Sequence, residues 1–333
     1  MRLAINGFGR IGRLILRALA ERKDPNITVV AINDLGSLQD NAHLFKYDSI
    51  HGRFGGEVKV DKDTIDVGLG PIKVLTSSKP EDLPWKDMDV DLVMECSGHF
   101  ASREGGEKHL KAGAKKVLIS APADNVDLTV VYGVNHSKIS PAHKIISNAS
   151  CTTNCLAPLA HVLHKSIGIE NGYMTTIHAY TADQRLVDAF HKDPRRARAA
   201  AISMIPTSTG AARAVGLVMP ELKGKLDGTA IRVPTSNVSF VDLTFNASRK
   251  TSAEEINDLM KKAATSELKG ILDIVDEPLV SVDFNHNAFS SSFDATQTQV
   301  IEGTLCRVAS WYDNEWGFSN RMIDTAKLMI EKS

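Results

Sequence analysis

The chain has few cysteines and almost no net charge. Four cysteines in 333 residues are too sparse for a disulfide framework, which is typical of small secreted domains. The 39 basic and 40 acidic side chains give a formal charge of −1, so no bulk basicity favours a nucleic acid or a membrane surface as partner. We therefore predict neither as a dedicated partner.

The sequence also lacks long apolar runs, internal repeats and low-complexity tracts. No run approaches the roughly 18 apolar residues of a membrane-spanning helix. The first residues lead directly into a strand and a turn, so we expect no secretory leader and a cytoplasmic location. Cys151 and Cys155 are one helical turn apart, but no His or Cys cluster completes a zinc site, and we predict no metal.

The length and the patterns of the chain favour two domains with a large core. For residues 1–149 we expect an α/β Rossmann-type doubly wound domain. For residues 150–315 we expect an α+β catalytic domain with a mixed sheet. A last helix over 316–333 carries Met322, Ala326 and Met329 on one face, and we expect it to pack back on the first domain.

A glycine-rich turn near the N-terminus indicates a dinucleotide site. The apolar strand 2–6 runs into Gly7, Gly9 and Gly12 with the spacing Gly-x-Gly-x-x-Gly, and helical periodicity follows. A second buried strand, 27–32, leads to Asp34 about 20 residues beyond the turn. The glycines let backbone amides approach a pyrophosphate, and Asp34 would bind the ribose hydroxyls and repel a 2′-phosphate. This favours NAD over NADP, the alternative being that Asp34 is a solvated loop acid.

Further strands extend this first domain. Short β-rich pieces between 57 and 75 indicate an antiparallel excursion. The strand 90–96 ends at Ser97-Gly98, where doubly wound sheets bind their cofactors, and a helix begins at Ser102. Additional strands are predicted at 116–120, around 129–132 and at 144–147.

The pattern changes after residue 168. A polar, Arg-rich stretch over 183–207 has no clear periodicity and is too long for a simple connector. We expect it to be functional or to form an intersubunit contact. Longer β-rich runs fall at 172–180, 230–233, 237–245 and 304–312, and helices are expected near 210–218, 252–266 and 316–331.

Ser150-Cys151 lies at the predicted start of a helix in the middle of the chain. Ser150 can cap that helix, which places Cys151 in its first turn, where the helix end favours thiolate over thiol. Pro158 should kink the helix or be relieved locally. The alternative is a small buried cysteine, and the helix alone favours that alternative. The motifs in the rest of the chain favour the interpretation of Cys151 as a nucleophile.

A cysteine in a chain that binds NAD indicates covalent oxidation of an aldehyde. Thiolate attack gives a thiohemiacetal that can release hydride, and the product is a thioester. His178, at the end of the strand 173–177, is the best candidate for the base. Hydroxyls and amides at 207–212 suit an anion at a helix start. Arg232, in an apolar strand, needs an anionic partner, which could be phosphate or a protein carboxylate.

Together these segments resemble phosphorylating glyceraldehyde-3-phosphate dehydrogenases over essentially the whole chain. The most specific match is the segment 149–154, and the segments 6–12, 178–181, 207–212, 232–235 and 311–315 match further parts of that family. The resemblance implies that Cys151 is the nucleophile and His178 the base. It also implies a homotetramer in which 183–207 crosses a subunit interface.

The resemblance further assigns residues to the cofactor and to two phosphates. Thr181 and Arg232 would hold the C3 phosphate of the substrate, with Arg196 reaching between this site and a second one. The second site, for attacking inorganic phosphate, would comprise Ser150, Thr152, Thr209 and Gly210. The cofactor residues would be Gly7, Gly9, Arg10, Ile11, Gly12, Asp34, Ser78, Ser120 and Asn314.

Two departures from the family pattern affect the cofactor site. Phe318 stands where tyrosine is common near the nicotinamide, so a hydroxyl contact is missing. Ala189-Phe190 stands where NAD-specific members often carry Leu-Pro, which weakens the preference for NAD without reversing it.

The leading hypothesis is NAD-dependent oxidation of D-glyceraldehyde 3-phosphate with inorganic phosphate to 1,3-bisphosphoglycerate. A close alternative is erythrose-4-phosphate dehydrogenase, which shares the Cys and His but resembles the chain less around Tyr180-Thr181 and 207–212. An alternative of another class is a non-catalytic NAD-binding redox sensor with an oxidisable Cys151.

Overall fold

The computed structural model describes residues 1–332, and Ser333, the last residue of the expected terminal helix, lies outside the described part. The chain folds into two compact units, called unit 1 and unit 2 below. Unit 1 comprises residues 1–130, 136–150 and those from Ser319 onward. Unit 2 comprises residues 131–135 and 151–318.

Unit 1 is built on a nine-stranded sheet in the order β10-β11-β9-β8-β1-β2-β7-β6-β5. All neighbours from β10 to β7 pair in parallel, and β6 and β5 continue as an antiparallel extension. This confirms the predicted doubly wound arrangement with its antiparallel excursion. The strands are β1 Arg2–Asn6, β2 Thr28–Asn33, β5 Lys59–Asp61, β6 Thr64–Asp66, β7 Ile72–Leu75, β8 Leu92–Glu95, β9 Lys116–Ile119, β10 Leu128–Thr129 and β11 Ile145–Ser147.

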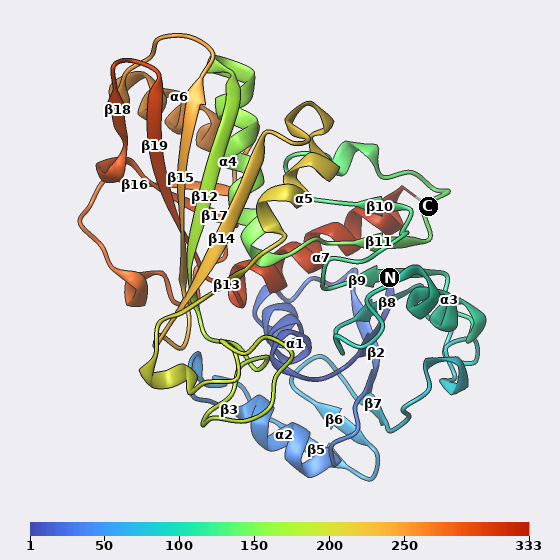
Figure 1. The fold of residues 1–333 in the computed structure, drawn as a ribbon. Helices are drawn as coiled ribbons and strands as arrows, with labels where there is room; N and C mark the ends of the chain where they lie inside the picture. The colour runs from blue at the N-terminus through green and yellow to red at the C-terminus, as the bar shows by residue number, and fades with distance from the viewer. Residues whose placement is uncertain (333) are drawn as a thin grey trace. The chain divides into compact units, whose positions relative to one another are not determined.

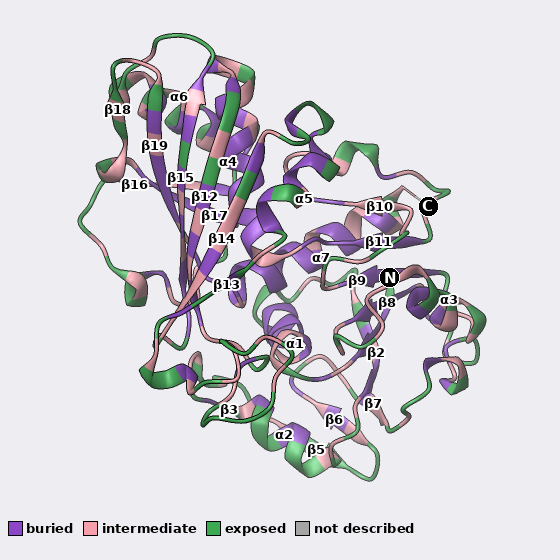
Figure 2. Cartoon of the chain, in the orientation of Figure 1, coloured by how far each residue is buried: buried purple, intermediate pink, exposed green. Residues whose placement is uncertain are grey.

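The central strands of unit 1 are apolar along their whole length because helices and loops cover both faces. Every residue of β8 and β9 is buried, and the purple strands in Figure 2 show this. The helix α2 and the small β3–β4 hairpin were not predicted. The helices are α1 Arg10–Arg22, α2 Leu38–Lys46 and α3 Arg103–Lys111, with 3-10 turns at Pro80–Asp82 and His136–Lys138, and the hairpin pairs β3 Tyr47–Asp48 with β4 Gly52–Arg53.

Unit 2 contains an eight-stranded sheet in the order β13-β14-β12-β15-β19-β17-β16, with β18 paired to β19. The pair β12–β14 is parallel and β12–β15 is antiparallel, so the sheet is mixed, as predicted. Figure 1 shows the long strands β12, β14, β15 and β19 side by side. The strands are β12 Ile169–Ala179, β13 Ile205–Ser208, β14 Leu226–Val233, β15 Ser239–Ala247, β16 Leu272–Val275, β17 Ser291–Asp294, β18 Gln299–Ile301 and β19 Leu305–Tyr312.

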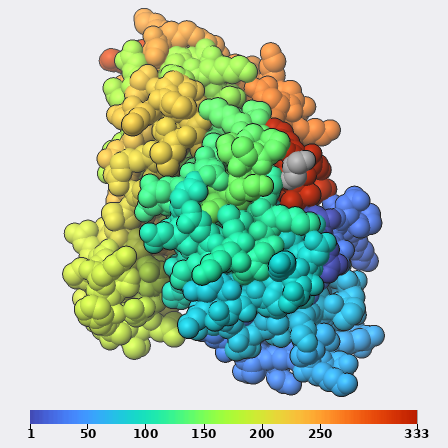
Figure 3. All heavy atoms as spheres, turned by 90° about the vertical axis from the view of Figure 1, so that its right-hand side faces the viewer, coloured from blue at the N-terminus to red at the C-terminus, as the bar shows by residue number. Residues whose placement is uncertain are grey.

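The helices of unit 2 pack around α4, which contacts α5, α6 and several strands of the sheet. Pro158 lies inside α4, and the helix continues through it without a break. The helices are α4 Cys151–Ile167, α5 Ala211–Val218 and α6 Ala253–Thr265, with 3-10 turns at Ala200–Ile202, Pro220–Leu222, Ser281–Phe284 and Ala295–Gln297. The segment 183–207 is mostly irregular before β13, and its yellow-green atoms form a broad surface patch in Figure 3.

The last helix, α7 (Trp316–Glu331), begins in unit 2 and continues in unit 1 from Ser319 onward. Within unit 1, Thr325 Oγ1 donates to Asn148 Oδ1 over 2.8 Å, and the buried Lys116 Nζ donates to the carbonyl of Met329 over 2.8 Å. Met322, Ala326 and Met329 are fully buried, as their helical spacing predicted. Within the described part of the chain, no helix has the length and apolarity needed to cross a bilayer.

Candidate active site

The glycine turn between β1 and α1 depends on two close backbone approaches. Gly7 has φ +89°, and a Cβ on it would lie 2.4 Å from the backbone nitrogen of Ser97. A Cβ on Gly12 would lie 2.1 Å from the carbonyl oxygen of Gly7. A Cβ on Gly9 would have no atom within 4 Å, and Gly9 precedes the first residue of α1. The turn therefore leaves backbone amides accessible at a helix N-terminus, which suits a pyrophosphate.

Asp34 follows the end of β2 and holds the turn. Its Oδ2 accepts from the backbone N–H of Phe8 over 2.8 Å, and its Oδ1 accepts from that of Gly36 over 2.8 Å. The carboxylate is thus fixed beside the glycines, and it lines the same pocket. A carboxylate fixed in this position can accept hydrogen bonds from a ribose.

A pocket of about 540 Å³ lies at the carboxyl ends of β1, β2 and β8. Several residues of the pocket wall were not predicted from the sequence. The rule that cofactors bind at the carboxyl ends of parallel strands did point to this edge of the sheet. Four of the predicted cofactor residues, Gly7, Gly9, Asp34 and Ser78, line it. The other lining residues are Asn6, Asn33, Leu35, Ser77, Cys96, Ser97, His99 and Phe100.

Four further predicted cofactor residues of unit 1 are absent from the pocket wall. Gly12 supports the turn from within α1, and Ile11 also belongs to that helix. The guanidinium of Arg10 pairs with Asp48 at 2.7 Å. Ser120 follows β9, and its backbone N–H donates to the carbonyl of Glu95 over 3.0 Å.

A buried polar network lies behind the pocket and connects two of its walls. Glu95 Oε2 accepts from Asn6 Nδ2 over 2.6 Å and from His109 Nε2 over 2.9 Å. Glu95 Oε1 accepts from the backbone N–H and the hydroxyl of Ser97. Trp85 Nε1 donates to His109 Nδ1 over 3.0 Å, so the imidazole proton of His109 is on Nε2 and points to Glu95.

Glu95 is ionised in this network. Burial alone would raise its pKa, but hydrogen bonds from His109, Ser97 and Asn6 outweigh that effect and hold the pKa below the ordinary value. The carboxylate therefore fixes the strand ends of β1 and β8 on either side of the glycine turn. Only the Ser97 position was singled out from the sequence.

In unit 2, the structure brings the two predicted catalytic residues together. Cys151 begins α4 and His178 lies near the end of β12, and the Cys151 Sγ to His178 Nε2 distance is 3.6 Å. A sulfur and an imidazole at this distance can exchange a proton. The sequence alone could not show that these two side chains are in contact, because the residues are 27 positions apart in the chain.

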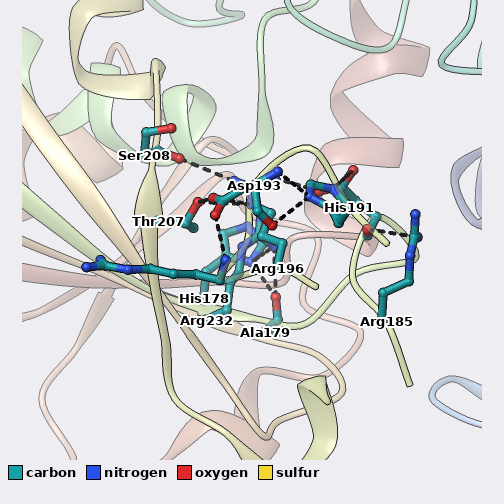
Figure 4. A network of polar contacts seen from close by, with 11 residues as sticks. His178, Ala179, Arg185, His191, Asp193, Arg196, Thr207, Ser208 and Arg232 are labelled. Carbon is teal, nitrogen blue, oxygen red and sulfur yellow. Dashed lines mark hydrogen bonds and ion pairs between the residues drawn. The ribbon is translucent and has the colours of Figure 1, made fainter. Parts of the chain in front are cut away.

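Arg232, on β14, approaches the other ring nitrogen of His178. Arg232 pairs with His178 in the parallel register of β14 and β12, so the two side chains lie on the same face of the sheet. Its Nη1 lies 2.9 Å from His178 Nδ1 and 3.0 Å from the carbonyl oxygen of Ala179. Figure 4 shows these three residues in contact.

These surroundings shift the pKa of both predicted catalytic groups. Burial, and then the charges of Arg232 and Arg196, lower the pKa of His178 to about 3, so the imidazole is neutral. Burial raises the pKa of Cys151, and Arg232 opposes this effect. Desolvation therefore acts against the thiolate that the helix start is expected to favour, and Arg232 acts with the helix start.

Two hydroxyl clusters support the pair from behind. The hydroxyl of Tyr312 lies 2.8 Å from Thr152 Oγ1 and 2.9 Å from Thr176 Oγ1, all in a buried position. Separately, Ser239 Oγ accepts from the backbone N–H of Ala179 and donates to Asn314 Oδ1. Asn314 is thus connected to the residue next to His178, and its side chain has a fixed orientation.

Most of the predicted phosphate residues lie in unit 2, on several elements. Thr209 Oγ1 accepts from the backbone N–H of Ala211 over 3.2 Å, at the start of α5, where Gly210 is exposed. Thr181 follows β12 and is half-buried. Ser150 lies directly before α4, in the part of the chain assigned to unit 1.

Arg196, in contrast, is held by protein groups. Its Nη1 pairs with Asp183 Oδ2 at 2.6 Å, and its Nε donates to Thr207 Oγ1 over 3.0 Å. A third contact goes from Nη2 to the carbonyl of Ser208 over 3.2 Å. Figure 4 shows Arg196 within this network. A phosphate bound by Arg196 would have to share the guanidinium with Asp183.

A doubly wound unit with a glycine turn, followed by a unit with a Cys–His pair, defines a nicotinamide-dependent oxidoreductase. Comparison with protein families specifies the class further. Residues 1–103 match the model "Glyceraldehyde 3-phosphate dehydrogenase, NAD binding domain", and residues 150–314 match "Glyceraldehyde 3-phosphate dehydrogenase, C-terminal domain".

Curated relatives agree with these matches. The chain is 65% identical over 329 residues to a glyceraldehyde-3-phosphate dehydrogenase of Xanthobacter flavus, covering 99% of this chain and 98% of that protein. It is 61% identical over 328 residues to the plasmid-encoded one of Cupriavidus necator, covering 98% and 97%. It is 55% identical over 333 residues to that of Geobacillus stearothermophilus, covering 100% and 99%.

The chain belongs to the glyceraldehyde 3-phosphate dehydrogenase family. The resemblance noted in the sequence is therefore confirmed, and so is the two-part fold. The cofactor is NAD, since the first matched domain is an NAD-binding domain and the glycine turn, Asp34 and the strand ends fit a dinucleotide.

Proposed function

We propose that this protein oxidises D-glyceraldehyde 3-phosphate with NAD and inorganic phosphate to 1,3-bisphosphoglycerate, with Cys151 as nucleophile and His178 as base. The observation that carries the proposal is the 3.6 Å distance between Cys151 Sγ and His178 Nε2, with Arg232 on the far side of the imidazole. Such a pair at a helix start is the arrangement that covalent catalysis by cysteine needs.

The chemistry follows from the positions of these groups. The Cys151 thiolate attacks the aldehyde carbon and forms a carbon–sulfur bond, which gives a thiohemiacetal. His178 Nε2 then takes the proton of its hydroxyl, so that the carbon can give up hydride and become a thioester. NAD, when bound, supplies the hydride acceptor. Inorganic phosphate attacks the thioester carbon and releases the Cys151 thiolate.

The substrate's own phosphate would be held by Thr181 and Arg232. Among residues 1–332, Arg232 has no ion pair with a carboxylate, and its Nε is buried without a hydrogen-bond partner. A buried guanidinium without an anion favours an external one. The attacking phosphate would be held by Ser150, Thr152, Thr209 and Gly210, with Arg196 between the two sites.

The proposal also covers the domain organisation and the oligomeric state of the protein. We propose that residues 1–149 with the terminal helix serve as the NAD-binding domain and 150–315 as the catalytic domain, with Ser120 and Asn314 along the cofactor. We also propose a cytoplasmic homotetramer. Apolar side chains at Leu186, Val187, Phe190, Ile202 and Met204 are largely exposed in the 183–207 segment, which supports an intersubunit role. Sedimentation of the purified protein tests the tetramer.

Steady-state kinetics test the reaction. We expect NADH production from glyceraldehyde 3-phosphate to require inorganic phosphate, and NAD to be preferred to NADP. Cys151→Ser should abolish turnover while NAD still binds. Phosphate-independent turnover with a higher kcat/KM for erythrose 4-phosphate would favour the four-carbon alternative. Absence of any NADH absorbance would favour the redox sensor.

A further inference from the structure

Ser239, the first residue of β15, connects two parts of the predicted catalytic site. The strand β15 pairs with β12, and Ser239 is almost completely buried, with 1% of the residue exposed. Its Oγ accepts a hydrogen bond from the backbone N–H of Ala179 over 3.0 Å and donates one to Asn314 Oδ1 over 2.8 Å. The carbonyl oxygen of Ala179 lies 2.7 Å from His178 Nδ1. One hydroxyl therefore joins the Asn314 amide to the residue whose backbone also contacts the imidazole of His178.

This hydroxyl determines which end of the Asn314 amide faces it. A serine hydroxyl has one proton to donate, and the N–H of Ala179 already donates to its oxygen. Within residues 1–332, Asn314 Oδ1 is the sole acceptor for the hydroxyl proton of Ser239. If the amide were turned over, its NH2 group would face Oγ, and the buried hydroxyl proton would lose its acceptor. The orientation with Oδ1 toward Ser239 is therefore favoured.

In this orientation the amide nitrogen of Asn314 points away from Ser239. Nδ2 makes no hydrogen bond within residues 1–332, although only 6% of the residue is exposed. A largely enclosed NH2 group without an acceptor is suited to an oxygen of a bound molecule. The carboxamide of a nicotinamide ring provides such an oxygen, and the proposed function places Asn314 along that cofactor.

The backbone next to this amide is held separately from its side chain. Asn237 Nδ2 donates to Asp313 Oδ2 over 2.9 Å, and Asp313 Oδ1 accepts from the backbone N–H of Trp316, the first residue of α7, over 2.7 Å. Asn237 and Ser239 thus hold the consecutive residues Asp313 and Asn314. Loss of the Ser239 hydroxyl should therefore release the Asn314 amide and leave the backbone around it in place.

We propose that Ser239 is a positioning residue that holds the Asn314 amide so that Nδ2 donates to the carboxamide oxygen of the nicotinamide. Through the backbone of Ala179, the same hydroxyl keeps this donor at a fixed place relative to the base. Ser239 acts through Asn314, and no contact of its own with the cofactor is required. The inference rests on the proposed function, because it takes NAD as the molecule that receives the hydrogen bond.

The direct test compares NAD with ADP-ribose, which has the same adenosine and pyrophosphate but no nicotinamide. In the full-length protein, we expect Ser239→Ala to raise the dissociation constant of NAD by about three- to tenfold, the effect of one lost hydrogen bond. The dissociation constant of ADP-ribose should not change. The ratio of the two constants is insensitive to a general loss of folded protein, and calorimetric titration measures both. An unchanged ratio would contradict the inference.

A matched pair of variants isolates the hydroxyl. Ser239→Thr keeps it, and Ser239→Val has nearly the same shape without it, so only Ser239→Thr should keep the ratio of the wild type. Ser310→Ala is the control for a buried serine, because the Ser310 hydroxyl pairs with that of Ser291 over 2.8 Å in the same unit and not with Asn314. We expect Ser310→Ala to lower stability and to leave the ratio unchanged.

A double variant tests whether Ser239 acts through Asn314. Asn314→Ala removes the proposed donor, and it should by itself raise the dissociation constant of NAD relative to that of ADP-ribose. If Ser239 acts by holding this amide, adding Ser239→Ala to Asn314→Ala should change the ratio no further. Additive effects of the two substitutions would instead show an independent structural role of Ser239 and overturn the inference.

The outcomes separate the inference from the function on which it rests. If Asn314→Ala changes the ratio and Ser239→Ala does not, the inference is wrong and the proposed reaction stands. If the wild type makes NADH but Asn314→Ala leaves the ratio unchanged, this amide does not hold the nicotinamide, and the inference fails with that assignment. If the wild type makes no NADH from glyceraldehyde 3-phosphate, NAD and phosphate, the proposed function itself fails.

Discussion

At the scale of single residues, the reactivity of Cys151 is set by two opposed effects. Burial raises the pKa of its thiol, and the Arg232 cation lowers it. His178 contributes no positive charge, because burial and the two arginines hold its pKa at about 3. The nearest cation therefore has the main electrostatic influence on how much thiolate is present at neutral pH.

We expect Arg232→Gln to slow the alkylation of Cys151 by iodoacetamide about tenfold at pH 7, since loss of one nearby charge shifts a pKa by about one unit. The difference should shrink as the pH rises above the thiol pKa of both proteins, because each is then thiolate. Arg213→Gln is the matched control, since that arginine pairs with Asp227 on the surface of the same unit. A deficit that persists at high pH would indicate restricted access instead.

Alkylation reports on Cys151 alone for a physical reason. Burial raises the pKa of Cys155 to about 12 and also raises that of Cys96 and Cys306. None of these three thiols has a nearby cation that opposes the effect of burial, as Arg232 does for Cys151. Mass spectrometry of the modified chain checks this directly.

At the scale of elements, the strand ends of unit 1 depend on Glu95. This carboxylate ties the end of β1, through Asn6, to Ser97 after β8, and both residues line the pocket. His109 of α3 supplies a further donor to the same carboxylate. A change at Glu95 should therefore affect the cofactor before it affects the chemistry.

We expect Glu95→Gln to raise the dissociation constant of NAD about tenfold, because the amide group would face donors and misplace Asn6 or Ser97. The value of kcat at saturating NAD should change less. Trp85→Phe is the control: it removes a donor to His109 at a point away from the pocket and should lower stability without weakening NAD binding. Calorimetric titration with NAD and thermal unfolding provide both measurements.

Because Glu95 is ionised in the folded protein, we expect the protein to lose stability at acid pH. The folded pKa of Glu95 lies below the ordinary value of 4.5, so its contribution is fully present above that pH and is lost as the pH falls through the folded value. The difference in unfolding free energy between wild type and Glu95→Gln should shrink over this range.

Some elements could be predicted from sequence because local pattern and burial agree. The strands β1, β2, β8 and β9 are apolar runs with turn residues at their ends, and they were placed correctly. The edge strand β13 contains a proline, and the short β17 is polar by sequence although every residue is buried, so neither was predicted. Their placement depends on pairing with distant strands.

The site was predictable in its residue types and not in its distances. The motif around Cys151 and the position of His178 singled out both residues, but their contacts with Ala179 and Arg232 arise from the register of β12 with β14. The support of Tyr312 for Thr152 and Thr176 is likewise a tertiary contact. No local pattern in the sequence carries this information.

At the scale of the whole molecule, the end of the chain completes unit 1. Lys116 on β9 is buried, and its Nζ donates to a carbonyl in the last turn of α7, where cations are favoured. This contact joins residues 213 positions apart. The stability of the NAD-binding part therefore depends on residues that follow the catalytic part in sequence.

We expect Lys116→Met to lower the free energy of unfolding by about 1–3 kcal/mol, because the Met329 carbonyl loses its buried donor. The neighbouring Lys115→Met is the control, since its exposed ion pairs with Asp89 and Asp91 contribute at most about 1 kcal/mol. Denaturant unfolding measures both. Equal effects of the two substitutions would contradict the role given to the contact with α7.

The passage of α7 from one unit to the other has a consequence for synthesis on the ribosome. The first 150 residues emerge early, yet the helix that contributes Met322, Ala326 and Met329 to the core of unit 1 is translated after the catalytic part. The nascent NAD-binding part must therefore wait with an uncovered apolar surface until the catalytic part has been made. A chain cut short by a premature stop would keep that surface exposed, and this gives chaperones and proteases a means of recognising incomplete molecules.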